Sequence, residues 1–329
     1  MQEKYLTLLR CPYNGKKLHC KNIIKKNEKI KEGILIEPSS GNEYPIVNFI
    51  PRFVPEENYA RSFGYQWNIH YRTQYDKQSG YSSSQERFEN VSKWGNNLSD
   101  ELILEVGCGA GRFTEHAVNT NAMVISFDYS NAVEANYRSN GQLDNLLIVQ
   151  ADIYNMPFNK LSFDKAFCFG VLQHTPDPKQ SFISIVKYLK PNGCIASDVY
   201  HKTLIGWLLQ TKYYVRPFTK GKDPDKLYKL VKIYVEFMWS LAKIIRKIPK
   251  IGHALNWRLL VADHYNILPN ADDATLKEWA ILDTFDMLSP MYDFPQTIKT
   301  FNKWHEEAGL TNIDICKGYN GLEGRGKVK

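Results

Sequence analysis

Short apolar runs alternate with amphipathic stretches between residues 99 and 200, and most of these runs end in a turn rich in glycine or aspartate. The runs cover residues 102–106, 123–127, 146–150, 163–169 and 194–199. Such short runs are typical of strands buried on both faces of a parallel sheet, and the stretches between them have helical spacing. This order predicts an α/β fold with a doubly wound parallel sheet.

A glycine-rich turn follows the first run. Gly107, Gly109 and Gly111 come directly after the predicted strand that contains Glu105. Glycine allows positive φ and places no Cβ between backbone and ligand, so this turn is a candidate binding loop. A nicotinamide-dinucleotide fold also has a strand, a glycine turn and a helix, but its fingerprint needs a third glycine where this chain has Arg112. A nicotinamide oxidoreductase is therefore the weakest alternative.

The turn resembles motif I of the class I S-adenosylmethionine-dependent methyltransferases, and later motifs of that family follow in order. The resemblance places Glu105 near a methionyl amine and Asp152 and Ile153 at an adenine ring. Asp128 ends the second predicted strand, where a carboxylate can accept hydrogen bonds from ribose hydroxyls. The implied cofactor-binding residues are Glu105, Gly107, Cys108, Gly109, Gly111, Asp128, Tyr129, Asp152, Ile153, Phe169 and Gly170. The implied fold is a Rossmann-like seven-stranded sheet over a core at residues 99–200, and the implied cofactor is S-adenosyl-L-methionine.

Residues 1–55 are predicted to be a separate small domain. Their pattern resembles a zinc-ribbon-like domain whose relatives include the activator subunit of tRNA and protein methyltransferases. Of the four thiolate positions in such ribbons, only Cys11 is a cysteine, and the others are Asn14, Glu37 and Ser40. Closed zinc sites need four soft or imidazole ligands. We therefore predict a degenerate, metal-free ribbon that packs on the catalytic domain or helps to cover its cleft.

Residues 56–98 are expected to form lid or linker helices. Residues 59–67 place aromatic side chains around a single glycine, and they resemble a segment that precedes motif I in small-molecule and glycan methyltransferases. Aromatic faces attract a sulfonium, which favours a lid over the cofactor. Gln66 and Trp67 are the predicted substrate contacts, although a plain packing stripe explains the aromatic residues equally well.

A basic helical insertion is predicted at residues 201–265, before residues 266–329 complete the fold. Between residues 201 and 260, thirteen Lys and Arg outnumber three Asp and Glu, whereas the whole chain has a net charge of +7. Tyr228, Val231, Val235 and Trp239 have helical spacing there. The segment favours a phosphorylated or lipid-linked small acceptor, with an anionic membrane surface as another partner and nucleic acid less favoured. A solvated helix pair with a basic face explains the charge equally well.

Methyl transfer from a sulfonium depends mainly on positioning and desolvation, so a single base is sufficient. His174, just beyond the fourth predicted strand, is the candidate catalytic base because imidazole titrates near neutrality. His201 and His264 are alternatives, and both are candidate substrate contacts together with Tyr292. Asp286 is a further candidate for orienting the acceptor.

The chain lacks two features of methyltransferases that act on nucleic-acid bases. Residues 169–172 lack the tetrapeptide that holds planar amines in base methyltransferases, and no cysteine pair is placed for attack on a pyrimidine. O-methylation of a small molecule, sugar or lipid-linked acceptor, in glycan or natural-product biosynthesis, is the preferred interpretation, and methylation of nitrogen or carbon stays open. An RNA base methyltransferase and a catalytically idle scaffold protein are the alternatives.

Composition adds an expectation of location. The chain has 43% hydrophobic and 23% charged residues, and its six cysteines are scattered. We find no signal peptide and no apolar run approaching a membrane span. These features predict a cytoplasmic protein, with a peripheral position at a membrane as the alternative.

Overall fold

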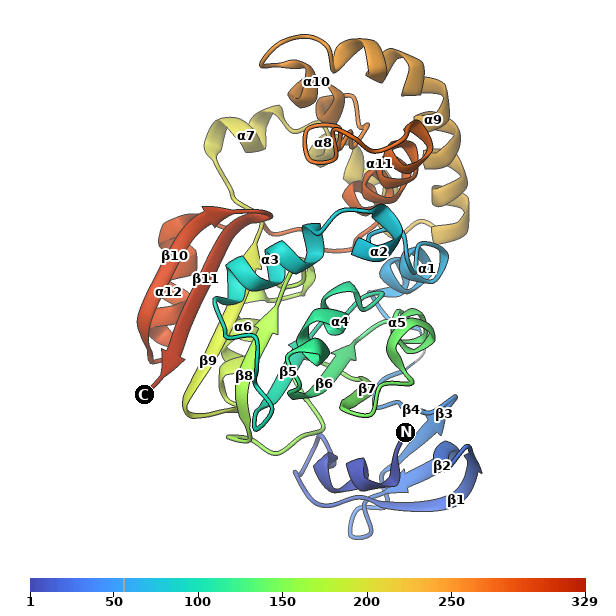
Figure 1. Cartoon of the computed structure of the whole chain (residues 1–329), viewed down its shortest axis with the longest axis vertical. Helices are drawn as coiled ribbons and strands as arrows, with labels where there is room; N and C mark the ends of the chain where they lie inside the picture. The colour runs from blue at the N-terminus through green and yellow to red at the C-terminus, as the bar shows by residue number, and fades with distance from the viewer. Residues whose placement is uncertain (56) are drawn as a thin grey trace.

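The five apolar runs form the parallel part of a seven-stranded sheet (Figure 1). The computed structural model describes residues 1–55 and 57–329, but not the side chain of Ile205. Residue 56, the first position of the predicted lid segment, lies outside this description. The strands are β5 (Leu102–Val106), β6 (Met123–Asp128), β7 (Leu146–Gln150), β8 (Phe163–Cys168), β9 (Leu189–Val199), β10 (Leu310–Gly318) and β11 (Gly321–Val328). Their order is β7-β6-β5-β8-β9-β11-β10, with β10 and β11 antiparallel, so the predicted seven-stranded α/β fold is confirmed.

Helices cover both faces of this sheet because alternate strand residues point to opposite sides. On one face, Ile103 and Val124 pack against α3 (Ser83–Ser92), α4 (Arg112–Asn119) and α5 (Val133–Asn140). On the other face, Leu104 and Ile125 share a core with α6 (Pro178–Val186) and α12 (Ile298–Glu307). Helix α6 ends at Val186, shortly before β9 begins at Leu189.

A small antiparallel sheet stands beside β7 at the edge of the central sheet (Figure 1). It contains β1 (His19–Lys26), β2 (Lys29–Ile36), β3 (Glu43–Val47) and β4 (Ile50–Pro51), and the short 3₁₀ helix η1 (Glu3–Leu8) precedes it. The Phe53 N–H donates to the Gln150 carbonyl at 2.8 Å, and Leu9 is buried in the same core as Leu104. The N-terminal unit thus packs on the central domain.

The four positions compared with ribbon thiolates lie at two turns, which a hydrogen bond from Asn14 to Glu37 joins. The Asn14 side chain and the Ser40 N–H donate to the Glu37 carboxylate at 3.0 and 2.8 Å, and Cys11 Sγ lies 3.3 Å from the Tyr44 hydroxyl. These hydrogen bonds, with others from Ser39, hold the pKa of Glu37 well below its usual range. Within residues 1–55 and 57–329, no group of three or more His, Cys, Asp or Glu is arranged to hold a metal ion. The likeness to a zinc ribbon stays a prediction.

Helices cover the carboxyl ends of the parallel strands (Figure 1). We call residues 204–288 the helical cap; it contains α7 (Leu204–Leu209), α8 (Lys212–Thr219), α9 (Pro224–Ile245), α10 (Gly252–Arg258) and α11 (Asp273–Leu288). The short helices α1 (Arg61–Ile69) and α2 (Asp76–Ser79) lie between the cap and the sheet. None of the described helices has the length and apolar character that a bilayer crossing requires.

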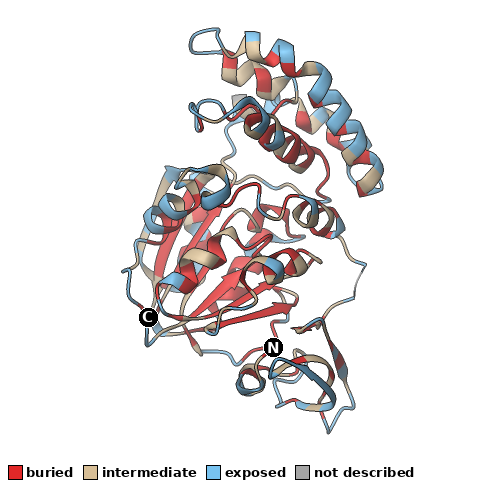
Figure 2. Cartoon of the chain, turned by 45° about the vertical axis from the view of Figure 1, so that its right-hand side comes forward, coloured by how far each residue is buried: buried red, intermediate tan, exposed pale blue. Residues whose placement is uncertain are grey.

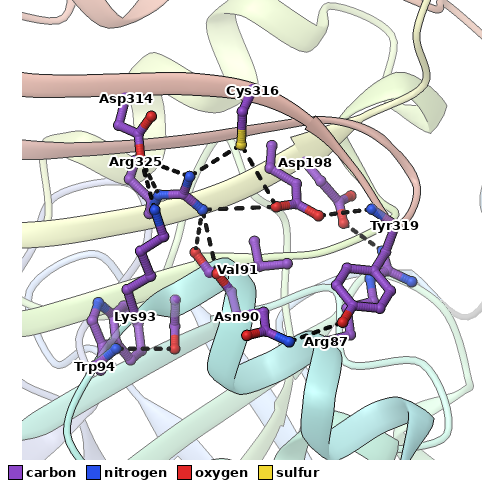
Figure 3. Close-up of polar contacts among 12 residues, drawn as sticks. Arg87, Asn90, Val91, Lys93, Trp94, Asp198, Asp314, Cys316, Tyr319 and Arg325 are labelled. Carbon is purple, nitrogen blue, oxygen red and sulfur yellow. Dashed lines mark hydrogen bonds and ion pairs between the residues drawn. The ribbon is translucent and has the colours of Figure 1, made fainter.

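Polar contacts fasten α3 to the C-terminal hairpin (Figure 3). Arg325 on β11 donates from Nε and Nη2 to Asp314 at 3.0 and 2.7 Å, and from Nη1 to the Val91 carbonyl at 3.0 Å. The Asn90 amide donates to the Tyr319 hydroxyl at 2.9 Å. One wall of the candidate site is built on this junction.

Candidate active site

A cavity of about 640 Å³ lies between the carboxyl ends of the strands, helix α1 and the helical cap. The sheet contributes the glycine turn, Asp128 and Phe169, and the cap contributes Lys212, Trp257, His264, Trp279 and Asp283. In an open α/β sheet, ligands bind outside the carboxyl ends of the strands, which is where this cavity lies. No described residue of the N-terminal unit lines it; of the two placements predicted for this unit, the structure shows packing on the central domain.

The glycine turn requires glycine at each of its three positions. Gly107, Gly109 and Gly111 have φ angles of +75°, +53° and +90°. A Cβ on Gly109 would lie 3.1 Å from the Trp67 indole nitrogen, and one on Gly111 would lie 2.2 Å from Asn136 Oδ1. The turn therefore combines left-handed backbone with close packing, and the cavity meets bare backbone there.

Asp128 is fixed at the end of β6. Its Oδ2 accepts the Gly109 N–H at 3.0 Å, and its Oδ1 accepts the Ser130 N–H and hydroxyl at 2.8 and 2.7 Å. Burial raises the pKa of this carboxyl, and these hydrogen bonds oppose the shift. The carboxylate lines the cavity in a set orientation and retains lone pairs for ligand hydroxyls.

The other predicted cofactor residues fall into two groups. Cys108, Tyr129, Ile153, Phe169 and Gly170 line the cavity together with the glycines. Glu105 and Asp152 do not line it.

Glu105 and Asp152, which do not line the cavity, accept hydrogen bonds from other residues of the protein. Glu105 is buried behind the turn, where it accepts the Thr114 hydroxyl, and burial raises its pKa to about 7. Asp152 Oδ1 accepts the Tyr154 N–H at 3.0 Å. The Glu105 carboxyl thus supports the turn from behind, and its predicted role with a methionyl amine stays a prediction.

His174 ends the 3₁₀ turn η2 (Leu172–His174) and lines the cavity. Its Nδ1 lies 2.9 Å from the Tyr292 carbonyl oxygen. A carbonyl can only accept, so Nδ1 carries the proton, and in the neutral ring Nε2 keeps a free lone pair. The rings of Phe63 and Tyr200 pack at 5.1 and 5.3 Å and hold the imidazole in place.

The side chains of Gln66 and Tyr292 do not line the cavity. Gln66 is completely buried off the cavity wall, and its amide donates to Asp286 at 3.3 Å. Tyr292 reaches the site through its carbonyl, and its ring packs edge-on to Tyr59 at 5.4 Å. Each of these two side chains therefore positions another group, and their predicted contacts with a substrate stay predictions.

Asp286 on α11 faces the cavity. Its Oδ2 accepts the Tyr200 hydroxyl at 3.4 Å, in addition to the Gln66 amide on Oδ1. Burial is the main cause that raises its pKa. A carboxyl with only long hydrogen bonds can accept a further donor from a ligand.

The cap adds a histidine–carboxylate pair. His264 Nε2 lies 2.6 Å from Asp283 Oδ2, and the His264 ring packs between Trp257 and Trp279. Trp67 and His201 also line the cavity.

Several cavity residues were missed from the sequence. Arg87, Arg112, Lys212, Trp257, Trp279 and Asp283 belong to this set. Burial and the neighbouring Arg87 lower the pKa of Arg112 to about 10. Signals existed for Arg112, which follows the last glycine of the turn, and for Lys212, which belongs to the basic segment 201–260. The others come from helices whose packing alone brings them to the site.

Comparisons with known proteins agree with this geometry. The family model described as "Methyltransferase domain" matches residues 104–197. Residues 104–197 are a methyltransferase domain. This family match, with the seven-stranded sheet and its glycine turn, confirms the predicted class I methyltransferase domain and its S-adenosylmethionine cofactor.

The curated relatives align with less than half of this chain. Ubiquinone biosynthesis O-methyltransferases of Pasteurella multocida (strain Pm70) and Histophilus somni (strain 2336) are 27% and 28% identical to it over 159 and 154 residues. Each alignment covers 44% of this chain, but only 66% and 65% of those proteins. The crystal structure of the CurJ carbon methyltransferase aligns over 83% of this chain and 61% of its own, with 12% identity and a TM-score of 0.45.

Proposed function

We propose that this chain transfers a methyl group from S-adenosylmethionine to the oxygen of a small hydroxylated acceptor. The observation that carries the proposal is a single cavity that joins the glycine turn and Asp128 to the free Nε2 of His174. The O-methyltransferases among the similar proteins support an oxygen acceptor.

Residues at the strand ends would hold the cofactor. Asp128 would accept the ribose hydroxyls, the glycine turn would allow close approach of backbone, and Ile153 and Phe169 would pack against the adenine. When bound, S-adenosylmethionine supplies an electrophilic methyl group on a sulfonium. The aromatic side chains of Tyr59 and Phe63 in the wall favour a cationic centre.

His174 and the cap would act on the acceptor. Nε2 of His174 removes the hydroxyl proton while Nδ1 stays bonded to the Tyr292 carbonyl, so the ring does not turn as it gains charge. Asp286 on the cap side accepts a second donor of the acceptor and orients it. The cap excludes water, which favours transfer by positioning and desolvation.

Binding of S-adenosylmethionine and S-adenosylhomocysteine by calorimetry tests the cofactor site. We expect micromolar binding by the whole chain and at least a tenfold loss in Asp128→Ala, because the carboxylate fixes both the turn and the ribose. Asp100→Ala, which changes an exposed aspartate before β5 and off the cavity wall, is the matched control and should bind as the unaltered protein does. Absence of binding in the unaltered protein would reject the proposal; binding would justify a screen of hydroxylated acceptors with labelled cofactor.

A further inference from the structure

Helix α9 has two apolar faces, and only one of them is covered. Leu227, Val231, Val235 and Trp239 are buried and pack within the cap, in contact with α11. A second set of large apolar side chains on the same helix is exposed to solvent: Leu230, Ile233, Phe237, Leu241 and Ile244. At about 100° per residue, this second set falls within an arc of about 80°.

The exposed set is a continuous stripe along the outer side of the cap. Phe237 is 82% exposed and Ile233 is 65% exposed, which is unusual for such side chains on a helix that already has a buried face. Figure 2 shows α9 at the outer edge of the cap, with exposed positions along its outward side. Ile248 and Ile251, in the turn after α9, are also exposed. We call Leu230, Ile233, Phe237, Leu241 and Ile244 the α9 stripe.

Basic side chains flank the stripe on one side. Lys229, Lys232 and Lys243 fall on the helix between the stripe and the buried face, and the turn that follows carries Lys247 and Lys250. Lys229 and Lys243 pair with Asp225 and Asp273 at 2.6 and 3.4 Å.

Three further lysines on this side make no ion pair with the described part of the chain, although Glu236 also lies on this side of α9. Lys232, Lys247 and Lys250 have no carboxylate within 4.0 Å anywhere in residues 1–55 and 57–329. The surface therefore combines an apolar strip with net positive charge.

We infer that the α9 stripe and its basic flank dock on an anionic lipid bilayer. Interfacial helices of this kind place apolar side chains at the acyl boundary while lysines meet anionic headgroups. A second copy of this chain fits less well, because an antiparallel two-fold contact between the stripes would place the two basic flanks side by side. Nucleic acid fits less well because phosphates gain nothing from a strip of Leu, Ile and Phe.

The docking surface lies close to the catalytic cavity. Helix α9 packs on α11, and Asp283 and Asp286 of α11 line the cavity. Packed helices lie about 10 Å apart, so a docked bilayer would be roughly one helix layer from the cavity. If the proposed methyl transfer holds, this position suits an acceptor held at a membrane surface.

Vesicle cosedimentation of the full chain tests the docking without any measurement of activity. We expect binding to vesicles of phosphatidylcholine with phosphatidylglycerol, and weak binding to phosphatidylcholine alone. The double variant Ile233→Glu, Phe237→Glu should bind anionic vesicles at least tenfold more weakly. The matched control is Ile23→Glu, Ile24→Glu on β1, which puts the same two charges on exposed apolar positions far from the cap and should bind as the unaltered protein does.

A second variant tests the charge. Lys232→Glu with Lys247→Glu leaves the stripe intact and should also lower binding to anionic vesicles, with a native thermal unfolding curve. No binding of the unaltered chain to anionic vesicles overturns the inference, as does an equal loss in the β1 control. Self-association that the stripe variant abolishes, without vesicle binding, would assign the surface to a second copy instead. None of these outcomes depends on methyl transfer, so the two proposals fail separately.

Discussion

His174 has one ring nitrogen bonded to protein and the other free in the cavity, and this division fixes its chemistry. Because Nδ1 donates to the Tyr292 carbonyl at 2.9 Å, the neutral ring must present an unprotonated Nε2. Asp128 is fixed in a comparable way by the Gly109 and Ser130 N–H groups. The hydrogen bonds that His174 and Asp128 already make within the protein therefore decide which of their atoms can meet a ligand.

Replacing His174 by Asn separates positioning from base catalysis. The Asn amide can donate to the Tyr292 carbonyl, as Nδ1 does, but it offers no base at the position of Nε2. We expect kcat to fall by about 10²–10⁴ with unchanged affinity for S-adenosylhomocysteine. His174→Ala, which also loses the hydrogen bond, should in addition unfold at a lower temperature. Steady-state kinetics of His174→Asn with an identified acceptor decide this, and an unchanged kcat would remove His174 from the role of base.

Glu105 makes stability depend on pH. Burial raises its pKa from 4.5 to about 7, so between these values the folded protein holds a proton that the unfolded chain releases. The stability from this group is complete below about pH 4.5 and is lost as pH rises to about 7, by roughly 3 kcal/mol. Glu105→Gln keeps an acceptor for Thr114 without the charge, so its thermal midpoint should fall less than that of the unaltered protein between pH 5 and 8. Glu306→Gln, an exposed glutamate on α12, is the control; identical pH profiles for all three proteins would contradict the assignment.

At the scale of elements, the junction of α3 with the C-terminal hairpin holds one wall of the cavity. Arg87 of α3 pairs with the buried Asp198 of β9, and Tyr319, which accepts from Asn90, also lines the cavity. Arg325 crosses the same junction from β11 to the end of α3 (Figure 3). Helix α3 and the hairpin are more than 200 residues apart in sequence, so neither element forms the wall alone.

Arg325→Ala should weaken this junction. The guanidinium is buried and makes two bonds to Asp314 and one to the Val91 carbonyl. Their loss should cost about 2 kcal/mol of unfolding free energy, since a buried carbonyl loses its charged donor. Lys93→Ala is the matched control, because Lys93 also bonds Asp314, at 3.1 Å, but is exposed and should cost under about 1 kcal/mol. Urea unfolding measures both, and equal losses would show that the junction contributes nothing beyond a surface ion pair.

At the scale of the whole molecule, two of the three units form the cavity and the third supports the sheet. The central domain provides the strand ends, the helical cap provides the opposite wall, and the N-terminal sheet supports β7 without reaching the cavity. Leu9 and Phe53 belong to the same core as Leu104, so the N-terminal unit is continuous with the central domain in its packing. The N-terminal boundary predicted near residue 55 marks a change of sheet and not a break in the core.

The sequence by itself determined the parallel sheet, the glycine turn and Asp128. These depend on local pattern: apolar runs set the strands, positive φ needs glycine, and a carboxylate at a strand end is fixed by its place in the chain. It also showed that charge collects between residues 201 and 260.

Only the tertiary structure decided which side chains share the cavity. Glu105 and Gln66 turned out to be buried behind it, while Arg87, Trp279 and Asp283 line it from distant helices. Helical spacing identified the Val231 face of α9, but which apolar face of a helix is covered depends on its neighbours. Packing between elements far apart in sequence decides both the lining of the cavity and the covered face of α9, and no local sequence pattern contains that information.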